Sequence, residues 1–402
     1  MFHTFIKNGK KTAAVNVFID PQWGFSSPGI PASKGGSLYV PGGEGAAEKM
    51  GEIIANTQNG IFIIGQDYHP KNHISFVTNH PGVMQYRIEQ YKKFLAQHRQ
   101  PIPPDAETLY DAAQQPVHFF NSPDQPPVPF PFEEIVLDEN DDIIGIKQAD
   151  GRIRHVEVTT ESGNAPSKSD RGRVSRVLDT YLEKTFDDYR AEGIIYHTQT
   201  LWTRHCEQGE QSSLYPESMN LPQGLRDKLS GDLKSDVVSY TDPTTGNEFH
   251  VIRKGSNSEI DSYGIGIEND MEPLPHSWNL FSELSRRLKK QGVHQVQFNV
   301  GGLATNFCTE FSINNIADYL SAPFKTKNIG VEINFVPEIS HAIPIPGGAE
   351  TPFSAEGAPI RMRESRGVGQ ISIADIIAAG KPGATITGEF SADRAAGVEQ
   401  TR

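Results

Sequence analysis

The sequence predicts an α/β protein with three layers, α/β/α, a mainly parallel sheet, and a large inserted α+β subdomain. Short apolar runs alternate with segments of helical periodicity, which is the pattern of a parallel sheet covered by helices on both faces. Several of these runs end in a charged side chain, at the edge where such sheets bind ligands. A proline-rich stretch without this alternation interrupts the pattern between residues 77 and 193.

The first two expected strands each end in an acid. Residues 13–20 form an apolar run that ends in Asp20, and residues 61–67 form a second that ends in Asp67. Runs of this length are typical of buried parallel strands. Between them, residues 44–58 have the periodicity of a helix, with four apolar side chains on one face: Ala47, Met50, Ile53 and Ile54.

Residues 77–193 form the expected insertion, which we predict to act as a lid or an oligomer contact. A helix is expected at Tyr86–His98, followed by a proline-rich, extended stretch at residues 101–131. Three alternating segments then predict an antiparallel meander: 133–138, 142–148 and 152–158. A polar loop at 162–173 and a helix at 174–190 complete the insertion, the helix predicted from apolar spacings of three and four.

The alternation of strands and helices resumes at residue 194. The expected elements are strands at 194–199, 249–254, 295–300 and 330–336, a helix at 278–291, and a last short strand and helix within 368–377. The α/β core therefore comprises residues 1–76 and 194–380. Residues 381–402 are polar and small, and we expect a loosely ordered tail.

Composition and charge limit the classes of partner. The 402 residues carry a formal net charge of −13, which argues against nucleic acids and anionic membranes. Two cysteines imply no disulfide framework. No apolar stretch is long enough for a signal peptide or a membrane span, so we expect a cytoplasmic protein, or one exported by a route that the sequence does not display.

Cys308 is the candidate nucleophile. It follows an apolar run and a Thr-Asn pair that can begin a helix over residues 305–320. In the first turn of a helix, backbone N–H groups and the helix dipole favour a thiolate and a nearby oxyanion. A lone cysteine is more often a buried, inert residue, so the position of Cys308 alone does not decide between the two.

A group of acidic and histidine residues suggests a metal site. Asp67 and His69 are two residues apart, so in an extended segment their side chains point the same way, and His73 follows four residues later. His205, in a Trp-Thr-Arg-His-Cys string, is a further candidate ligand. A carboxylate with imidazoles suits zinc, iron or manganese, although Asp-x-His alone is more often a loop with surface histidines.

Taken together, these motifs resemble the nicotinamidase/pyrazinamidase branch of the isochorismatase-like cysteine hydrolases. The similarity covers residues 13–76 and 197–377 and leaves the insertion uncovered. It is carried by segments 18–25, 35–43, 67–76, 202–209, 252–255, 261–263 and 302–308, among which Asp-x-His-Pro-x-x-His-x-Ser-Phe and Trp-x-x-His-Cys are the most specific strings.

The resemblance implies roles for particular residues. Cys308 would attack an amide carbonyl, and Asp20 would act first as general base and then as general acid. Lys254 would keep both groups charged, because a nearby cation lowers the pKa of each. The backbone N–H groups of Ala304 and Cys308 would form an oxyanion hole, with a cis peptide expected at Leu303–Ala304.

The resemblance also implies a divalent metal ion. Its ligands would be Asp67, His69 and His205, with His73 as a further ligand or a neighbour of the ligands. The metal would anchor the pyridine nitrogen of the substrate, and Phe25 and Trp202 would enclose its ring. The second cysteine, Cys206, would take no part.

The expected protein is therefore a metal-dependent amidohydrolase that converts nicotinamide, a small amide, to nicotinate and ammonia through a cysteine thioester. A homo-oligomer is a further expectation. Departures from the family pattern bear on the substrate: Trp23-Gly24, Glu210, Gly264-Ile265-Gly266 and Asn306. Two alternatives remain open. One is a cysteine amidohydrolase for a different small amide, and the other is a non-enzymatic interaction protein on a retained hydrolase core.

Overall fold

The computed structural model describes residues 2–114, 117–118, 128–129, 134–138, 143–147, 152–158, 174–185, 196–345, 347–381 and 383–386. The chain divides into two compact units. The first comprises Met1–Tyr68, Cys206–Ser256 and Ser262–Arg402, and the second comprises His69–His205 and Asn257–Asp261. The boundaries of the second unit thus differ from those expected for the insertion, and a short segment from later in the chain belongs to it.

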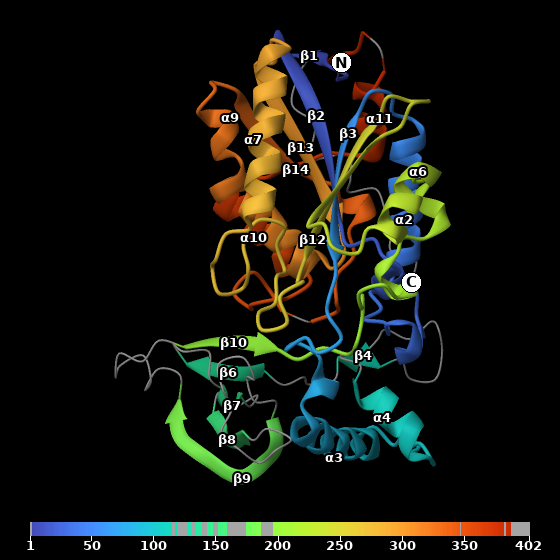
Figure 1. The fold of residues 1–402 in the computed structure, drawn as a ribbon. Coiled ribbons are helices and arrows are strands. Elements are labelled where there is room, and N and C mark those ends of the chain that lie inside the picture. The colour runs from blue at the N-terminus through green and yellow to red at the C-terminus, as the bar shows by residue number, and fades with distance from the viewer. Residues whose placement is uncertain are drawn as a thin grey trace. The chain divides into compact units, whose positions relative to one another are not determined.

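The first unit is a mixed α/β structure around a mainly parallel, nine-stranded sheet (Figure 1). Seven of its strands lie in the order β11 (Val237–Thr241), β12 (Glu248–Lys254), β3 (Ile61–Asp67), β2 (Lys10–Ile19), β13 (Gln295–Gly302), β14 (Gly330–Phe335) and β15 (Gly369–Gln370). The other two, β1 (Phe5–Lys7) and β16 (Thr385–Ile386), lie off this path, where β1 pairs with both β2 and β16. Every neighbouring pair from β12 to β15 is parallel, and β11 is an antiparallel edge strand. The predicted α/β class with a mainly parallel central sheet is confirmed.

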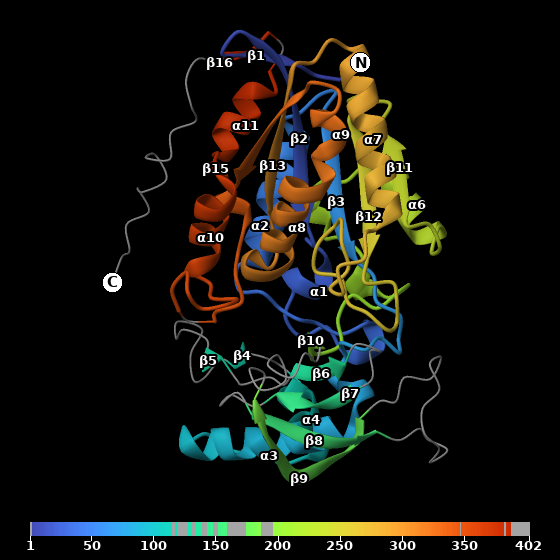
Figure 2. The same ribbon diagram turned by 90° about the vertical axis from the view of Figure 1, so that its left-hand side faces the viewer.

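Helices cover both faces of this sheet (Figures 1 and 2). On one face, α2 (Gly43–Ala55), α6 (Gln223–Gly231) and α11 (Ile373–Ala379) pack on strand side chains such as Phe18 and Phe62. On the other face are α7 (Pro275–Lys290) and α9 (Ala322–Lys325), where Phe281 and Phe324 contact Phe298 of β13. The remaining helices are α1 (Trp23–Ser26), α8 (Glu310–Asn315) and α10 (Gly357–Arg366).

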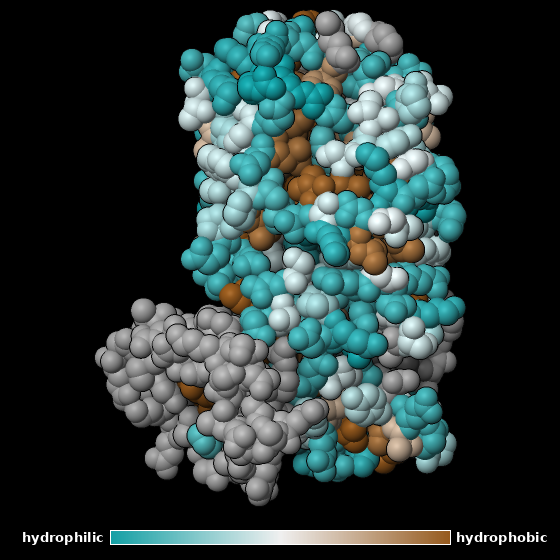
Figure 3. Space-filling view, viewed as in Figure 1, coloured by the Kyte–Doolittle hydropathy of each residue, from teal (hydrophilic) through white to brown (hydrophobic). Residues whose placement is uncertain are grey.

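The surface of the first unit is largely polar (Figure 3), as the composition of the chain leads us to expect. In the view of Figure 3, polar side chains surround small apolar patches on this unit. Among the described residues of the chain, no helix combines the length and the apolar content needed to cross a membrane.

The second unit contains a five-stranded antiparallel sheet in the order β10 (Tyr196–Thr200), β6 (Glu134–Asp138), β7 (Ile143–Lys147), β8 (Arg152–Val158) and β9 (Val174–Thr185). Two helices, α3 (Pro81–Gln97) and α4 (Ala106–Gln114), share a core with it that includes Val83, Leu95, Leu109, Ile135 and Ile146. A short pair, β4 (Val117–His118) and β5 (Val128–Pro129), lies in the segment expected to be proline-rich and extended. The predicted meander is confirmed.

The prediction of a helix at residues 174–190 is wrong, because residues 174–185 form strand β9. The pairing of β9 with β8 explains the error. Its register shifts at three places, so the residues opposite β8 include 174, 176, 177, 181 and 182. Bulges of this kind break the period of two that normally marks a strand, and the resulting spacing imitates a helix. Residues 186–190 and the polar loop expected at 162–173 lie outside the described residues.

Part of the tail expected to be loose is ordered. Strand β16 (Thr385–Ile386) pairs in parallel with β1 (Phe5–Lys7), a strand that the sequence did not predict. The edge strand β11 was also not expected. Residues 387–402 lie outside the described part of the chain.

Candidate active site

The structure brings four of the predicted site residues of the first unit together at the carboxyl ends of neighbouring strands. Lys254 ends β12, Asp67 ends β3, and the two are directly opposite in the parallel register. Asp20 follows β2, and Cys308 follows β13 by a short turn. Because β12, β3, β2 and β13 are adjacent in the sheet, these side chains reach one place from four parts of the chain.

The ammonium group of Lys254 is the centre of this cluster. Its Nζ lies 2.9 Å from Asp20 Oδ2 and 2.7 Å from Asp67 Oδ1. It also donates to the carbonyl oxygen of Ser262 at 3.1 Å and lies 3.6 Å from Cys308 Sγ. The side chains of Lys254 and Asp20 are fully buried, so one cation faces two carboxylates and a thiol in a site shielded from bulk solvent.

Burial dominates the ionisation of this cluster. It raises the pKa of Asp20 to about 6, although Lys254 acts in the opposite direction. It also raises the pKa of the Cys308 thiol well above its ordinary value, again against the effect of Lys254. Burial would lower the pKa of Lys254, but Asp20, Asp67 and Cys308 outweigh it, and the pKa lies well above its ordinary value. We expected Lys254 to lower both acidic pKa values. It acts in that direction, but loss of solvation is the larger effect.

The turn that carries Cys308 has an unusual backbone. Gly302 has a φ of 153°, and a Cβ atom there would lie 2.1 Å from the Ile19 carbonyl oxygen, so a side chain would collide with β2. The expected cis peptide at Leu303–Ala304 is confirmed. A π-helical turn, Thr305–Thr309, follows and continues into α8. Cys308 therefore lies in the first turn of a longer helical segment, as predicted.

Gln22 is a residue of this site that the sequence did not single out. Its Oε1 accepts a hydrogen bond from the backbone N–H of Asp67 at 2.8 Å, and its Nε2 donates to the backbone oxygen of Asp67 at 2.7 Å. This two-point contact joins the segment after Asp20 to the end of β3. The signal was present, because Gln22 lies within a segment that carries the family resemblance, but nothing in the sequence indicates its partner.

Asn306, which departs from the family pattern, forms hydrogen bonds between the turn that carries Cys308 and a loop much later in the chain. Its buried Nδ2 donates to the backbone oxygens of Ile343 at 2.9 Å and Phe353 at 2.6 Å. Its Oδ1 accepts from the N–H of Ile343 at 3.1 Å. Phe353 also stacks on Phe307, with ring centroids 4.7 Å apart. An ionised Asp could not donate to either carbonyl, which accounts for an amide at this position.

Two other departures have packing reasons. A Cβ atom on Gly264 would lie 2.1 Å from Asn315 Oδ1, which itself accepts hydrogen bonds from the N–H groups of Gly266 and Ile267. The side chain of Asn315 thus occupies the space that a residue other than glycine would need.

A Cβ atom on Gly24 would lie 2.6 Å from Cys206 Sγ. Cys206 is fully buried, and its thiol lies 3.6 Å from the Ser212 carbonyl oxygen. It occupies a packing position in the first unit.

Three histidines that were expected near the metal lie in the second unit. The ring centroid of His69 is 4.1 Å from that of His73 and 4.9 Å from that of His205, and all three side chains are buried. The Nδ1 atom of His205 lies 2.7 Å from the Thr203 carbonyl oxygen. Asp261, for which the sequence predicted no role, belongs to the same unit.

The two aromatic residues expected to enclose a substrate ring fall in different units. Phe25 lies in α1 of the first unit, where its backbone oxygen accepts from the N–H of Val40 at 2.9 Å. Trp202 lies in the second unit, where it pairs with the segment that contains Ser75 and Val77. Both side chains are buried.

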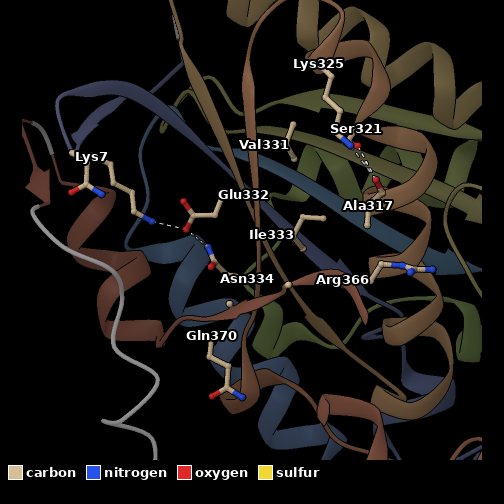
Figure 4. Close-up of a pocket in the computed structure, with 13 residues that line it drawn as sticks. Lys7, Ala317, Ser321, Lys325, Val331, Glu332, Ile333, Asn334, Arg366 and Gln370 are labelled. Carbon is tan, nitrogen blue, oxygen red and sulfur yellow. Dashed lines mark hydrogen bonds and ion pairs between the residues drawn. The ribbon is translucent and has the colours of Figure 1, made fainter. Parts of the chain in front are cut away.

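The first unit also has a pocket of about 550 Å³ beside β14 (Figure 4). Polar groups line much of it, including the Lys7–Glu332 ion pair, Lys325 and Arg366. Its lining residues include none of the residues around Lys254, so this pocket is separate from the candidate active site.

No protein-family model matches the sequence, and no curated protein matches it. Similar solved structures include a nicotinamidase/pyrazinamidase of Acinetobacter baumannii, with 19% identity over 90% of this chain and 97% of that chain and a TM-score of 0.42.

Two others are PnC1 of L. infantum in complex with nicotinate (15% identity, 94% and 96% coverage, TM-score 0.39) and the yeast nicotinamidase Pnc1p bound to nicotinaldehyde (13% identity, 79% and 98% coverage, TM-score 0.33). These are similarities only, and they assign no activity to this chain.

Proposed function

We propose that this protein hydrolyses the carbon–nitrogen bond of a small amide, and that nicotinamide is converted to nicotinate and ammonia. The observation that carries the proposal is the buried cluster in which Lys254 faces Asp20, Asp67 and Cys308. A nucleophile, a proton acceptor and a cation that orients both are the parts that covalent amide hydrolysis requires.

In the proposed reaction, Cys308 Sγ bonds to the amide carbonyl carbon while Asp20 takes the thiol proton. The carbonyl oxygen becomes an oxyanion opposite the N–H groups of Ala304 and Cys308. The carbon–nitrogen bond then breaks, Asp20 returns the proton to the departing ammonia, and a thioester remains. Water attacks the thioester with Asp20 again as the base, which releases the carboxylic acid and restores the thiol.

The raised pKa of Asp20 suits this role. A carboxylate with a pKa of about 6 accepts a proton more readily than an ordinary aspartate, yet it is still mostly ionised at neutral pH. Lys254 stabilises the negative charge wherever it resides, on the carboxylate before transfer or on the sulfur after it. Its contact with both groups therefore supports a proton transfer between them.

The available donors fit a divalent metal ion. We propose that His69, His205 and Asp67, which precedes His69 by two residues, would hold it, since two imidazoles and a carboxylate suit zinc, iron or manganese. The contact between His205 Nδ1 and the Thr203 carbonyl oxygen would fix that ring and leave Nε2 for the metal. When bound, the metal would supply a Lewis acid for the pyridine nitrogen of the substrate.

Ammonia release from nicotinamide tests this proposal. We expect activity from the wild-type protein and none above background from Cys308→Ala. Cys206→Ala is the matched control, because it removes the other buried thiol and should leave activity near the wild-type level. Equal activity in wild type and Cys308→Ala would contradict the proposed nucleophile.

A different small amide is the second candidate substrate. The combination of Gly264, Gly266 and Asn315 gives the segment after Tyr263 a shape that a chain with larger side chains could not adopt. Kinetics on a panel of small amides separate the two candidates. A higher kcat/KM for another amide than for nicotinamide would replace the substrate while keeping the chemistry.

A further inference from the structure

A second group of possible metal ligands lies entirely within the second unit. It consists of His69, His73 and Asp261, each of which offers one ligand atom within 4.8 Å of the others. All three side chains are at most 2% exposed. Two imidazoles and a carboxylate so close together and so well buried form a set that transition metals bind in proteins.

A backbone hydrogen bond holds the segment that contains Asp261 in the second unit. After Ser256 the chain enters the second unit again for Asn257–Asp261 and then returns to the first. The N–H of Ile74 donates to the carbonyl oxygen of Ser258 at 2.9 Å, which fixes this short segment beside the histidine loop. Asp261 therefore arrives from far along the chain, and the sequence offers no spacing by which to find it.

We propose that His69, His73 and Asp261 bind a divalent transition metal ion, with Asp261 as the carboxylate ligand. This inference rests on the single metal ion of the proposed function and gives an alternative set of ligands for it, so it can fail while the proposed amide chemistry stands. The set shares His69 with the one proposed above, so the two sets compete for a single ion per chain. Asp261 and Asp67 are then alternative carboxylate ligands.

Neighbouring polar groups orient two of these ligands. Gln199 Nε2 donates to Asp261 Oδ2 at 3.2 Å, which fixes the plane of that carboxylate. Ser75 Oγ lies 2.7 Å from His73 Nδ1. Contacts of this kind commonly hold metal ligands in position and set the tautomer of a ligating histidine.

The tautomer of His73 decides whether it can bind. If Nδ1–H donates to Ser75 Oγ, then Nε2 presents its lone pair to the metal. If Nε2–H instead donates to the carbonyl oxygen of Ile260, which lies 3.3 Å away, His73 stabilises the loop and cannot bind metal through Nε2. Ser75 Oγ can donate or accept, so its short contact fits both tautomers, whereas the Ser75 backbone N–H, which lies 3.3 Å from Nδ1, can only donate and favours the proton on Nε2. Metal binding at Nε2 therefore requires that proton to leave Nε2 and the contact with Ile260 to break.

Metal titration of the full-length protein tests the proposal. The protein is stripped with chelator and titrated with Co²⁺, and both the visible absorption and the bound metal per chain are measured. We expect about one ion per chain in the wild type. Asp261→Asn and His73→Gln should each weaken Co²⁺ binding by about tenfold or more and change the absorption spectrum, since loss of even a supporting residue of a metal site costs about 10–100-fold.

A control and a comparison variant make the outcomes distinct. Glu107→Gln removes one negative charge at an exposed position of α4 in the same unit and should leave Co²⁺ affinity unchanged. If Asp67→Asn weakens binding and Asp261→Asn does not, this inference is overturned and the ligands proposed above stand. If Asp261→Asn weakens binding and Asp67→Asn does not, this inference stands and the proposed role of Asp67 as a ligand fails.

A measurement on the wild type covers the case in which Asp261→Asn fails to fold. Crystals of the metal-loaded protein give the ion's position from anomalous scattering. A peak about 2.0–2.2 Å from an Asp261 carboxylate oxygen supports the proposal. A peak bound by other ligands, with Asp261 beyond bonding distance, overturns it.

Discussion

The two units of this protein assemble their polar groups in different ways. In the first unit, Asp20, Asp67 and Lys254 lie at the ends of adjacent parallel strands, and the hydrogen-bond register of the sheet sets their separation. In the second unit, His69, His73 and Asp261 come from loops, and single contacts such as that between Ile74 and Ser258 hold them together. Groups fixed by a sheet converge by topology, whereas groups fixed by loops converge only through particular hydrogen bonds.

The largest expected effect follows from removing the cation of the first unit. Lys254→Met removes the cation that faces the buried carboxylates of Asp20 and Asp67, and breaking a buried ion pair in this way costs about 3–5 kcal/mol of unfolding free energy. Urea unfolding measures this loss, and ammonia release should fall to background. Lys92→Met is the matched control, because the exposed Lys92–Glu89 pair should contribute too little to detect. Equal losses for the two variants would contradict the importance given to the buried cluster.

The Asn306 contact tests whether a loop interaction also matters in the first unit. Asn306→Asp removes the donors to the Ile343 and Phe353 carbonyl oxygens, and two unsatisfied buried acceptors should cost about 2–4 kcal/mol. Urea unfolding again provides the measurement. Asn56→Asp is the control, since exposed Asn56 donates only to the Glu52 oxygen of its own helix. An unchanged midpoint for Asn306→Asp would show that the sheet alone fixes this part of the site.

The pH dependence of activity reports the burial of the Asp20 carboxylate. Asp20 must be ionised to act as a base, and its pKa is raised to about 6. We therefore expect kcat/KM to rise about tenfold per pH unit up to about pH 6 and then to level off. A pH–rate profile between pH 4 and 8 is the measurement, restricted to the range in which circular dichroism shows a folded protein. A limb near pH 4 would mean that Asp20 is solvated or that another group is the base.

The smallest effect on activity is expected when the sheet and helices of the second unit are removed. Replacing residues 80–190 with a short Gly-Ser linker retains His69, His73 and His205. If this region is a lid or an oligomer contact, KM should change by roughly threefold or more, or the oligomeric state should change. Steady-state kinetics and light scattering test both. Unchanged kinetics and an unchanged oligomeric state would remove both proposed roles.

The sequence predicted the parts of the structure that follow from regular patterns. Asp67 and Lys254 could be placed at one edge because an apolar run that ends in a charge is a local signal. Strand β9 could not be predicted, because its bulges replace the alternation of a strand with helical spacing.

The side-chain contacts that complete the site were also beyond the sequence. Gln22 meets Asp67 across 45 residues, and Asn306 meets Ile343 across 37. Such contacts depend on where two loops pass each other, which no local pattern records. Asp261 illustrates the same limit, because its five-residue segment leaves one unit for another.

The central position of β2 has a consequence for synthesis of the chain. Strand β2 pairs with β3 on one side and with β13 on the other, and β13 begins at Gln295 whereas β3 ends at Asp67. A ribosome that adds about 5–20 residues per second needs roughly 10–45 seconds to make the intervening chain. Throughout that time residues 13–19 of β2 lack their partner strand β13, while Lys10–Thr12 can pair with β1. The nascent protein therefore carries an open apolar strand edge while its second unit is being made, and a chaperone that shields this edge would act in that interval.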